Sequence, residues 1–402
     1  MALNEVAAAE RLHIGFFGMR NAGKSSLVNA VTAQSFSVVS PVKGTTTDSV
    51  TKTMELLPLG PVVITDTPGL DDEGELGALR VEKARQTLDR IHLAVVVTEA
   101  FREPSAEELA LIKELKERNI PTVLALNKAD LGSSGVNLPD LPCVLVSAKT
   151  GQGVELLKET LGKLAPQSRT PRYIISDMIS PGDTVVLVTP IDESAPKGRL
   201  ILPQQLTLRD ILDAHGIALV CRETELAQTL SNLATPPKMV ITDSQAFGKV
   251  SRLVPESVPL TSFSILMARY KGDLKTQISG AARLATLRDG DRVLISEGCT
   301  HHRQCKDIGT VKIPGWIEGF SGAKPEYTFT SGGDFPTDLS EFQLIVHCGG
   351  CMLNEKEMAS RIEKAVAAKV PIVNYGLAIA QMHGILKRSV ELFPDVAKLL
   401  DE

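Results

Sequence analysis

The most informative motif near the start of the chain is Gly18-Met19-Arg20-Asn21-Ala22-Gly23-Lys24-Ser25, a glycine-rich loop that predicts the fold of the residues around it. It follows a short apolar run at 13–17 and precedes a segment that reads as a helix. A glycine-rich loop between a strand and a helix lets backbone N–H groups approach phosphate oxygens closely. In such a loop we expect Lys24 to reach the β- and γ-phosphates of a nucleotide and the Ser25 hydroxyl to ligate Mg²⁺.

Three further motifs follow apolar runs that read as strands. They are Asp66-Thr67-Pro68-Gly69, Asn127-Lys128-Ala129-Asp130 and Ser147-Ala148-Lys149. The carboxyl ends of parallel strands in an open α/β sheet gather such residues at one edge. There the carboxylate of Asp66 can hold Mg²⁺ through water, and that of Asp130 can accept hydrogen bonds from N1–H and the 2-amino group of guanine. The order of the motifs predicts a guanine-nucleotide P-loop domain at residues 1–168.

The segment from about residue 13 to 165 resembles the Era- and TrmE-like GTPases. The resemblance implies GTP hydrolysis with Mg²⁺, GTP and GDP as ligands, and Thr46 of Gly44-Thr45-Thr46-Thr47-Asp48 as a second Mg²⁺ ligand that senses the γ-phosphate. The expected catalytic residues are Lys24, Thr46, Asp66 and Gly69. The expected nucleotide contacts are Gly18, Asn21, Ala22, Gly23, Lys24, Ser25, Ser26, Asn127, Lys128, Asp130, Ser147, Ala148 and Lys149.

Two positions refine this expectation. Leu70 stands where many GTPases place a glutamine that orients water, and an apolar side chain cannot do this. Asn21 matches the position that helps hold K⁺ against the phosphates in the TrmE-like subgroup, so we expect hydrolysis stimulated by K⁺. Glu75 is a candidate for positioning water. The alternative, that the acidic run at 71–75 is a solvated switch segment, stays open.

The composition excludes several classes of protein. The 402 residues carry a formal net charge of −5, with 43% hydrophobic and 23% charged residues, which is typical of globular proteins with two or three domains. Neither a basic stretch for nucleic acid nor an apolar run long enough to span a membrane is present in the sequence. The first residues do not read as a secretory signal, so we expect a reducing, cytoplasmic location.

The six cysteines are unevenly distributed. Cys143 and Cys221 lie in apolar runs and are expected to be small buried residues, whereas Cys299, Cys305, Cys348 and Cys351 all fall in the last quarter. Between them, residues 166–171 read as a linker. Residues 172–262 alternate helices with short strands, which are expected at 184–188, 217–220 and 239–241. They show no catalytic constellation, so this α/β unit is expected to serve structure or assembly.

The late cysteines are expected to converge. Strands predicted at 292–296 and 342–346 are followed by Cys299 and by His347-Cys348 respectively, and a helix is predicted at 354–369, after Cys351. If these strands are parallel neighbours, their carboxyl ends bring the three thiols together near a helix N-terminus that favours thiolate charge. Three cysteines near histidines favour a metal site, and the spacing does not decide between zinc and a [4Fe–4S] cluster.

The pattern Cys299-Thr300-His301, a long interval, and then His347-Cys348-Gly349-Gly350-Cys351, after a GTPase domain, resembles the HydF family of [FeFe]-hydrogenase maturation. The resemblance covers essentially the whole chain. It implies an α/β dimerisation domain at 172–262 and an α/β [4Fe–4S] domain with a parallel sheet at 263–402. Cys299, Cys348 and Cys351 would hold the cluster, and Cys305 lies outside the motif. The fourth ligand stays open between His301, His347, an acidic residue, water and an incoming cargo ligand.

In that family the protein is a homodimeric scaffold and carrier. The resemblance implies a di-iron precursor as cargo, with two radical-SAM maturases and apo-[FeFe]-hydrogenase as partners, and neither nucleic acid nor membrane. Two alternatives remain. One is a GTPase for RNA modification or ribosome assembly with a structural zinc site, and the other is a thiol-redox enzyme that uses Cys348 and Cys351.

Overall fold

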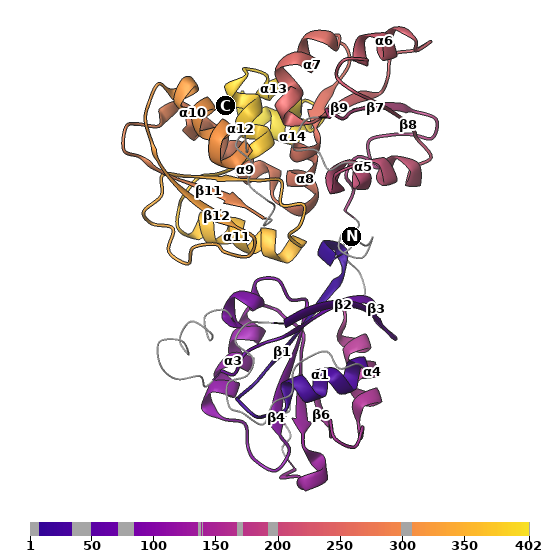
Figure 1. Cartoon of the computed structure of the whole chain (residues 1–402), viewed down its shortest axis with the longest axis vertical. Helices are drawn as coiled ribbons and strands as arrows, with labels where there is room; N and C mark the ends of the chain where they lie inside the picture. The colour runs from indigo at the N-terminus through magenta and orange to yellow at the C-terminus, as the bar shows by residue number, and fades with distance from the viewer. Residues whose placement is uncertain are drawn as a thin grey trace. The chain divides into compact units, whose positions relative to one another are not determined.

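The computed structural model describes residues 8–33, 50–70, 84–135, 138, 140–166, 172–191, 200–298 and 308–401. The chain divides into two compact units, Met1–Arg169 and Thr170–Glu402 (Figure 1). Of the described helices, none combines the length and apolar character that crossing a bilayer requires.

The first unit is built on a six-stranded sheet of order β2-β3-β1-β4-β5-β6. All neighbouring pairs are parallel except β2 with β3. The strands are β1 (Leu12–Phe17), β2 (Val50–Leu56), β3 (Gly60–Asp66), β4 (Leu93–Glu99), β5 (Thr122–Asn127) and β6 (Cys143–Leu145). The carboxyl ends of β1, β3, β4 and β5 therefore lie at one edge.

Helices cover both faces of this sheet. They are α1 (Lys24–Thr32), α3 (Ala106–Glu117) and α4 (Val154–Leu164), with a helical turn at 84–88 and short 3-10 turns η1 (Ala8–Glu10) and η2 (Ala129–Leu131). Alternate residues of β4 point to opposite faces: Val95 and Val97 join a core with α1 and α4, while Ala94 and Val96 join a core with α3. The central strands β1, β4 and β5 are mostly apolar because both faces of the sheet are covered.

The second unit holds two four-stranded sheets of orders β10-β9-β7-β8 and β12-β11-β13-β14, parallel throughout. The first consists of β7 (Thr184–Val188), β8 (Ile217–Cys221), β9 (Met239–Thr242) and β10 (Leu260–Ser262). The second consists of β11 (Arg292–Glu297), β12 (Glu326–Ser331), β13 (Leu344–His347) and β14 (Ile372–Asn374).

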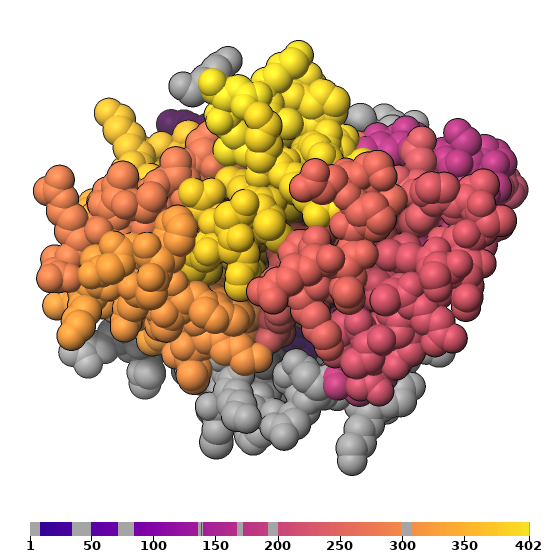
Figure 2. Space-filling model, turned by 90° about the horizontal axis from the view of Figure 1, so that it is seen from above, coloured from indigo at the N-terminus to yellow at the C-terminus, as the bar shows by residue number. Residues whose placement is uncertain are grey.

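Ten labelled helices connect and cover these strands. They are α5 (Leu202–Asp213), α6 (Leu226–Ser231), α7 (Phe247–Leu253), α8 (Phe263–Lys271), α9 (Leu274–Ala281), α10 (Ile313–Ser321), α11 (Glu355–Ala367), α12 (Tyr375–Met382), α13 (Leu386–Val390) and α14 (Pro394–Ala397). Short turns are η3 (Ser244–Ala246), η4 (Ala282–Thr286), η5 (Ile308–Lys312) and η6 (Lys398–Leu400). Figure 2 shows the segment of β7 to α7, in red, and that of β11 to β12, in orange, on opposite sides of the yellow C-terminal helices.

One hydrophobic core runs through both sheets of the second unit. It includes Val185 and Leu187 of the first sheet, Val293 and Ile295 of the second, and Phe263 of α8. The other face of the second sheet packs against α11 in a separate core. The predicted boundary between residues 262 and 263 falls at the start of α8, whose side chains belong to the shared core.

Candidate functional site

The glycine-rich loop lies between β1 and α1, as its sequence predicts. Gly18 and Gly23 have φ values of 145° and 89°, which L side chains rarely adopt. A Cβ at Gly18 would lie 2.2 Å from the Val97 carbonyl oxygen, and one at Gly23 would lie 2.3 Å from Nδ2 of Asn127. Both positions thus require glycine because the loop backbone runs directly against β4 and the base-binding motif.

The residues expected at the phosphates and Mg²⁺ lie together. The Lys24 ammonium donates hydrogen bonds to the carbonyl oxygens of Gly18, at 3.0 Å, and Met19, at 2.9 Å. The Ser25 hydroxyl donates to Oδ2 of Asp66 at 2.6 Å, across from the end of β3. Ser25, predicted to bind Mg²⁺ directly, and Asp66, predicted to bind it through water, come from separate motifs and are neighbours in the structure.

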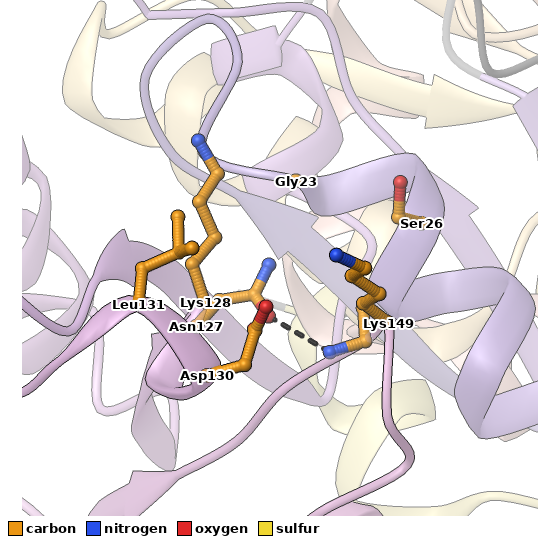
Figure 3. A pocket seen from close by; sticks show the side chains of 8 residues that line it. Gly23, Ser26, Asn127, Lys128, Asp130, Leu131 and Lys149 are labelled. Carbon is orange, nitrogen blue, oxygen red and sulfur yellow. Dashed lines mark hydrogen bonds between the residues drawn. The ribbon is translucent and has the colours of Figure 1, made fainter.

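A pocket of about 260 Å³ lies beside this loop. Figure 3 shows its lining, which comes from the loop and from the two later motifs: Gly23, Ser26, Asn127, Lys128, Asp130, Leu131, Ala148 and Lys149. Nδ2 of Asn127 donates to the carbonyl oxygen of Ala22 at 2.9 Å, and Oδ1 of Asn127 accepts from the backbone N–H of Ala148 at 3.1 Å. Asn127 thus ties the phosphate loop to the last motif.

Asp130 is exposed at the mouth of the pocket, where a guanine could reach it. The Ser147 hydroxyl donates to Oδ1 of Asp130 at 2.7 Å, and this hydrogen bond lowers the pKa of the Asp130 carboxyl below its usual value. The carboxylate is therefore ionised and acceptor-only at neutral pH, which suits the two N–H donors of guanine.

A charged network behind the pocket was not predicted from the sequence. The Lys128 ammonium pairs with Glu99 at the end of β4, and Arg102 bridges Glu99 to the buried Glu108. Burial would raise the pKa of Glu99, but hydrogen bonds and charge from Lys128 and Arg102 lower it overall. The sequence did contain one indication of this network: Glu99 is a charged residue at the end of an apolar strand, at the same carboxyl edge of the sheet as the nucleotide motifs.

Of the remaining residues expected at the nucleotide site, three are described by the structure. Asn21 is exposed with a φ value of 61°, Gly69 is buried, and the N–H of Leu70 donates to the Gly18 carbonyl oxygen at 3.3 Å. Thr46 and Glu75 lie outside the described residues.

The second candidate site is at the carboxyl edge of the β12-β11-β13-β14 sheet. β13 lies between β11 and β14, with His347 opposite Ser296 and Asn374. Cys348 follows β13, and its Sγ accepts hydrogen bonds from the N–H groups of Gly298, at 3.0 Å, and Gly350, at 3.4 Å. The cysteine side chain is thereby fixed between the ends of two neighbouring strands.

The thiols of both described cysteines of the motif have pKa values above the usual one. Burial raises the pKa of Cys348 to about 11. Burial also raises the pKa of Cys351, and the positive charge of the nearby Lys271 offsets part of this increase. The Lys271 ammonium donates to the carbonyl oxygens of Cys351 and Leu353 at 3.0 and 2.9 Å, although its side chain is only 2% exposed.

His347 is fully buried, and both of its ring nitrogens have partners. Nε2 lies 3.0 Å from Nη1 of Arg361, and Nδ1 lies 2.7 Å from the carbonyl oxygen of Cys348. Because a guanidinium only donates, Nε2 accepts and Nδ1 carries the proton that it donates to Cys348. Burial and the charge of Arg361 lower the pKa of His347 to about 3, so the imidazole is neutral.

Cys299, Thr300, His301, His302 and Cys305 lie outside the described residues, so their predicted convergence with Cys348 is not tested. Within the part of the chain that the structure describes, no three His, Cys, Asp or Glu side chains are arranged to hold a metal ion. Cys143 and Cys221 are partly buried thiols rather than fully buried ones.

Three family models match the chain. Residues 13–128 match the 50S ribosome-binding GTPase model, 174–272 the hydrogen maturase F dimerization domain, and 275–392 the hydrogen maturase F tetramerization domain. The last two together cover more than half of the chain. The chain belongs to the hydrogen maturase F (HydF) family. The predicted α/β class and P-loop GTPase domain are confirmed, and the family assignment made from the cysteine pattern is confirmed as well.

The similar proteins of known name are GTPases. The chain is 32% identical over 167 residues to the tRNA modification GTPase MnmE of Endomicrobium trichonymphae, a match that covers 40% of this chain and 36% of that protein. It is 27% identical over 239 residues to the GTPase Era of Caldicellulosiruptor saccharolyticus, covering 53% of this chain and 78% of that protein. The matched part thus spans about a third of the length of MnmE.

The comparison with solved structures matched part of the chain to Era of Aquifex aeolicus bound to GDP·AlF4⁻ and to the G domain of the T. maritima FeoB iron transporter. The first has a TM-score of 0.36 and 21% identity, covering 52% of this chain and 91% of that chain. The second has a TM-score of 0.31 and 24% identity, covering 38% and 98% respectively.

Proposed function

We propose that this HydF chain is a GTP-hydrolysing scaffold that binds a [4Fe–4S] cluster and carries a di-iron precursor to apo-[FeFe]-hydrogenase in the cytoplasm. The observation that carries the proposal is the pair Cys348 and Cys351 at the carboxyl edge of a parallel sheet, in a chain that also has a P-loop GTPase domain. We assign GTP binding to residues 1–168, dimerisation to 172–262 and the cluster to 263–402.

The residues of the cysteine edge fit an iron–sulfur cluster. Backbone N–H groups of Gly298 and Gly350 already donate to Sγ of Cys348, and such donors stabilise thiolate sulfur. The Lys271 ammonium beside Cys351 supplies positive charge against the thiolates. Cys299 is proposed as the third ligand, because it follows β11, the direct neighbour of β13.

Three cysteines would leave one iron with an exchangeable ligand, which is the chemistry that a carrier needs. The ring nitrogens of His347 are both bonded within the protein, which supports a fourth ligand from elsewhere: His301, an acidic residue, water or the cargo itself. We assign His347 to holding the backbone of the cysteine loop.

Hydrolysis is proposed to use the P-loop residues with K⁺. Lys24, Ser25 and Asp66 lie where they can hold the phosphates and Mg²⁺, with Thr46 completing the metal site. Leu70 cannot orient water, so we assign part of the charge neutralisation to a K⁺ ion held by Asn21.

The nucleotide is proposed to act as a switch rather than as a source of chemistry. A ligand can shift an arrangement of domains only by binding its states with different affinity. GTP would therefore change the affinity for the two radical-SAM maturases or for apo-hydrogenase.

Self-association is proposed from the two family models of the second unit, with 172–262 forming a homodimer. Among the described strands β8 pairs only with β7, and its residues Ile217 and Val220 are 50% and 46% exposed. An edge strand with exposed apolar side chains is suited to pairing with a second copy.

The proposal is tested by activation of apo-hydrogenase. The protein is loaded anaerobically by the maturases, repurified, and mixed with apo-[FeFe]-hydrogenase, and hydrogen evolution is measured. Loaded wild type is expected to activate it, whereas the Cys299→Ser/Cys348→Ser/Cys351→Ser variant is not. Equal activation by both proteins would refute the carrier function. A Cys143→Ser variant serves as the matched control and should activate like wild type.

The main alternative, a GTPase of RNA modification with a structural zinc, has less support. The MnmE match covers only 40% of this chain, whereas the second unit matches HydF models.

A further inference from the structure

The cysteine loop, residues 348–354 between β13 and α11, lies along the helix α8. Near the start of the loop, a Cβ added at Gly349 would lie 3.5 Å from Oγ of Ser264, in the first turn of α8. Near its end, two carbonyl oxygens of the loop accept hydrogen bonds from Lys271, the last residue of α8. The helix therefore supports the loop over its length and places one charged group against it.

Lys271 is a buried cation. Its side chain is 2% exposed, and its ammonium donates to the carbonyl oxygens of Cys351 at 3.0 Å and of Leu353 at 2.9 Å. Lysine is almost never buried to this extent, because an ammonium withdrawn from water must be stabilised by negative or dipolar groups around it. The cysteine loop supplies two such groups, so the ammonium has a fixed place against the main chain of Cys351.

Lys271 and the cysteines belong to segments that match different family models. The dimerization model matches residues 174–272, which include α8, whereas the tetramerization model matches 275–392, which include Cys348 and Cys351. The helix α8 contacts α5 of the first segment as well as α11, which follows the cysteine loop (Figure 1). The cysteine edge is therefore completed by a charged side chain from outside the segment that carries the cysteines.

The two cysteines have neighbours of opposite charge. Burial raises the pKa of Cys351, and the positive charge of Lys271 offsets part of this increase. Burial also raises the pKa of Cys348, and the charges of Cys351 and of the buried Glu297, at the end of β11, raise it further. The field of Lys271 thus reaches the sulfur of Cys351 and favours negative charge there.

A cation at this place acts on the two redox states of a cluster to different extents. A cluster held by three thiolates has a net negative charge, and its reduction adds another electron. The attraction between opposite charges grows with the charge and is weakly screened in a buried site, so the ammonium stabilises the reduced state more than the oxidised state. Net charge is one of the quantities that set the reduction potential of such clusters.

We infer that Lys271 is a positioning residue of the cysteine site whose charge raises the reduction potential of the cluster. A neutral donor can replace its hydrogen bonds to the loop, but not its effect on the potential. The inference rests on the cluster proposed above and concerns the potential of that cluster rather than its presence. It assigns to the segment matched by the dimerization model a role in the chemistry of the cysteine edge.

The test is a reductive titration of the anaerobically reconstituted full-length protein, followed by EPR. Lys271→Gln keeps a neutral donor near the loop oxygens, whereas Lys271→Met keeps only the length of the side chain. At the potential that reduces half of the wild-type cluster, we expect the ratio of reduced to oxidised cluster to be about tenfold lower in both variants. This corresponds to a shift of about 59 mV towards negative potential for a one-electron couple. Lys271→Gln should retain the iron and sulfide content of wild type.

Lys275→Met removes an exposed positive charge on α9, in the same unit, and should leave the potential unchanged. Unchanged potentials in both Lys271 variants, or loss of the cluster from Lys271→Gln, would overturn the inference and leave the proposed function standing. So would a Lys271→Met variant that loses the cluster while Lys271→Gln keeps it at the wild-type potential, because the role would then be structural alone. A wild-type protein that takes up no iron–sulfur cluster would refute the proposed function as well.

Discussion

At the scale of single residues, the nucleotide site depends on one asparagine. Asn127 was expected among the nucleotide contacts, and in the structure its side-chain amide bridges the carbonyl oxygen of Ala22 and the N–H of Ala148. The motif predicted the residue and its place at the sheet edge. The bridge could not be predicted, because it depends on how closely two loops distant in sequence approach.

The first prediction concerns Gly23→Ala. A methyl group would lie 2.3 Å from Nδ2 of Asn127, and φ of 89° already disfavours alanine, so the loop must move away from the base pocket. We expect GDP affinity to fall at least about tenfold, which corresponds to about 1.4 kcal/mol. Titration with a fluorescent GDP analogue measures this. Gly319→Ala, in α10 with no neighbour near its Cβ, should bind like wild type, and equal affinity of both variants would contradict the account.

The second prediction concerns the Cys348 thiol in the metal-free protein. Its folded pKa of about 11 exceeds the ordinary value of 9.0 for a thiol, so only the unfolded chain ionises between these pH values. The contribution of this thiol to the free energy of unfolding is therefore fully present below pH 9 and is lost as the pH rises towards 11. We expect alkylation of Cys348 by iodoacetamide at pH 9, followed by peptide mass spectrometry, to be much slower in folded than in urea-unfolded protein. Equal rates would show that the thiol is not held as described.

At the scale of elements, one arginine connects the strand ends of the cysteine edge. Nη1 of Arg361, on α11, contacts Ser296 of β11 and His347 of β13, and Nη2 donates to the carbonyl oxygen of Gly332 after β12. Glu357, one turn earlier on α11, accepts from the same guanidinium at 3.0 Å. The side chain thereby holds three parallel strands and a helix in fixed positions.

The third prediction is that Arg361→Met lowers the free energy of unfolding by about 3 kcal/mol. The methionine fills the volume but leaves buried acceptors without their charged donor. Urea unfolding monitored by circular dichroism measures the change. Arg209→Met, which removes a largely exposed ion pair with Asp213, should leave the free energy of unfolding close to that of wild type because solvent screens this pair. Similar stability of both variants would show that the buried network does not hold the edge.

The elements themselves were predictable to different degrees. β7 was predicted with its observed bounds, and the predicted helix at 354–369 corresponds to α11 with Asn354 as its N-cap. β10 and β12 were not predicted, because a strand of three residues and a polar edge strand give little periodicity.

At the scale of the whole molecule, the fourth prediction concerns the ion that assists GTP hydrolysis. We expect the GTPase rate to be about tenfold or more higher in K⁺ than in Na⁺ at equal ionic strength, because a positioned cation stabilises the developing negative charge. Asn21→Gly removes the proposed ligand while suiting φ of 61°, and should abolish the difference between the ions. Equal wild-type rates in K⁺ and Na⁺ would remove the ion from the mechanism.

The whole molecule joins two sites whose predictability differs for a physical reason. The nucleotide site is formed by short motifs, each following its own strand, so order and spacing indicate it. The cysteine edge combines residues far apart in the chain, and the structure describes Cys348 and Cys351 at the end of β13 while Cys299 lies beyond its described part. Membership of the HydF family supports the proposed carrier function.

The most direct test is anaerobic reconstitution with iron and sulfide, followed by iron and sulfide analysis and EPR of the reduced protein. We expect about four irons and four sulfides per chain and the spectrum of a reduced [4Fe–4S] cluster, which three thiolate ligands can hold. Cys299→Ser, Cys348→Ser and Cys351→Ser should each lose most of the cluster, whereas Cys221→Ser should keep it. A colourless protein that binds zinc, or full iron content in any of the three variants, would contradict the central claim.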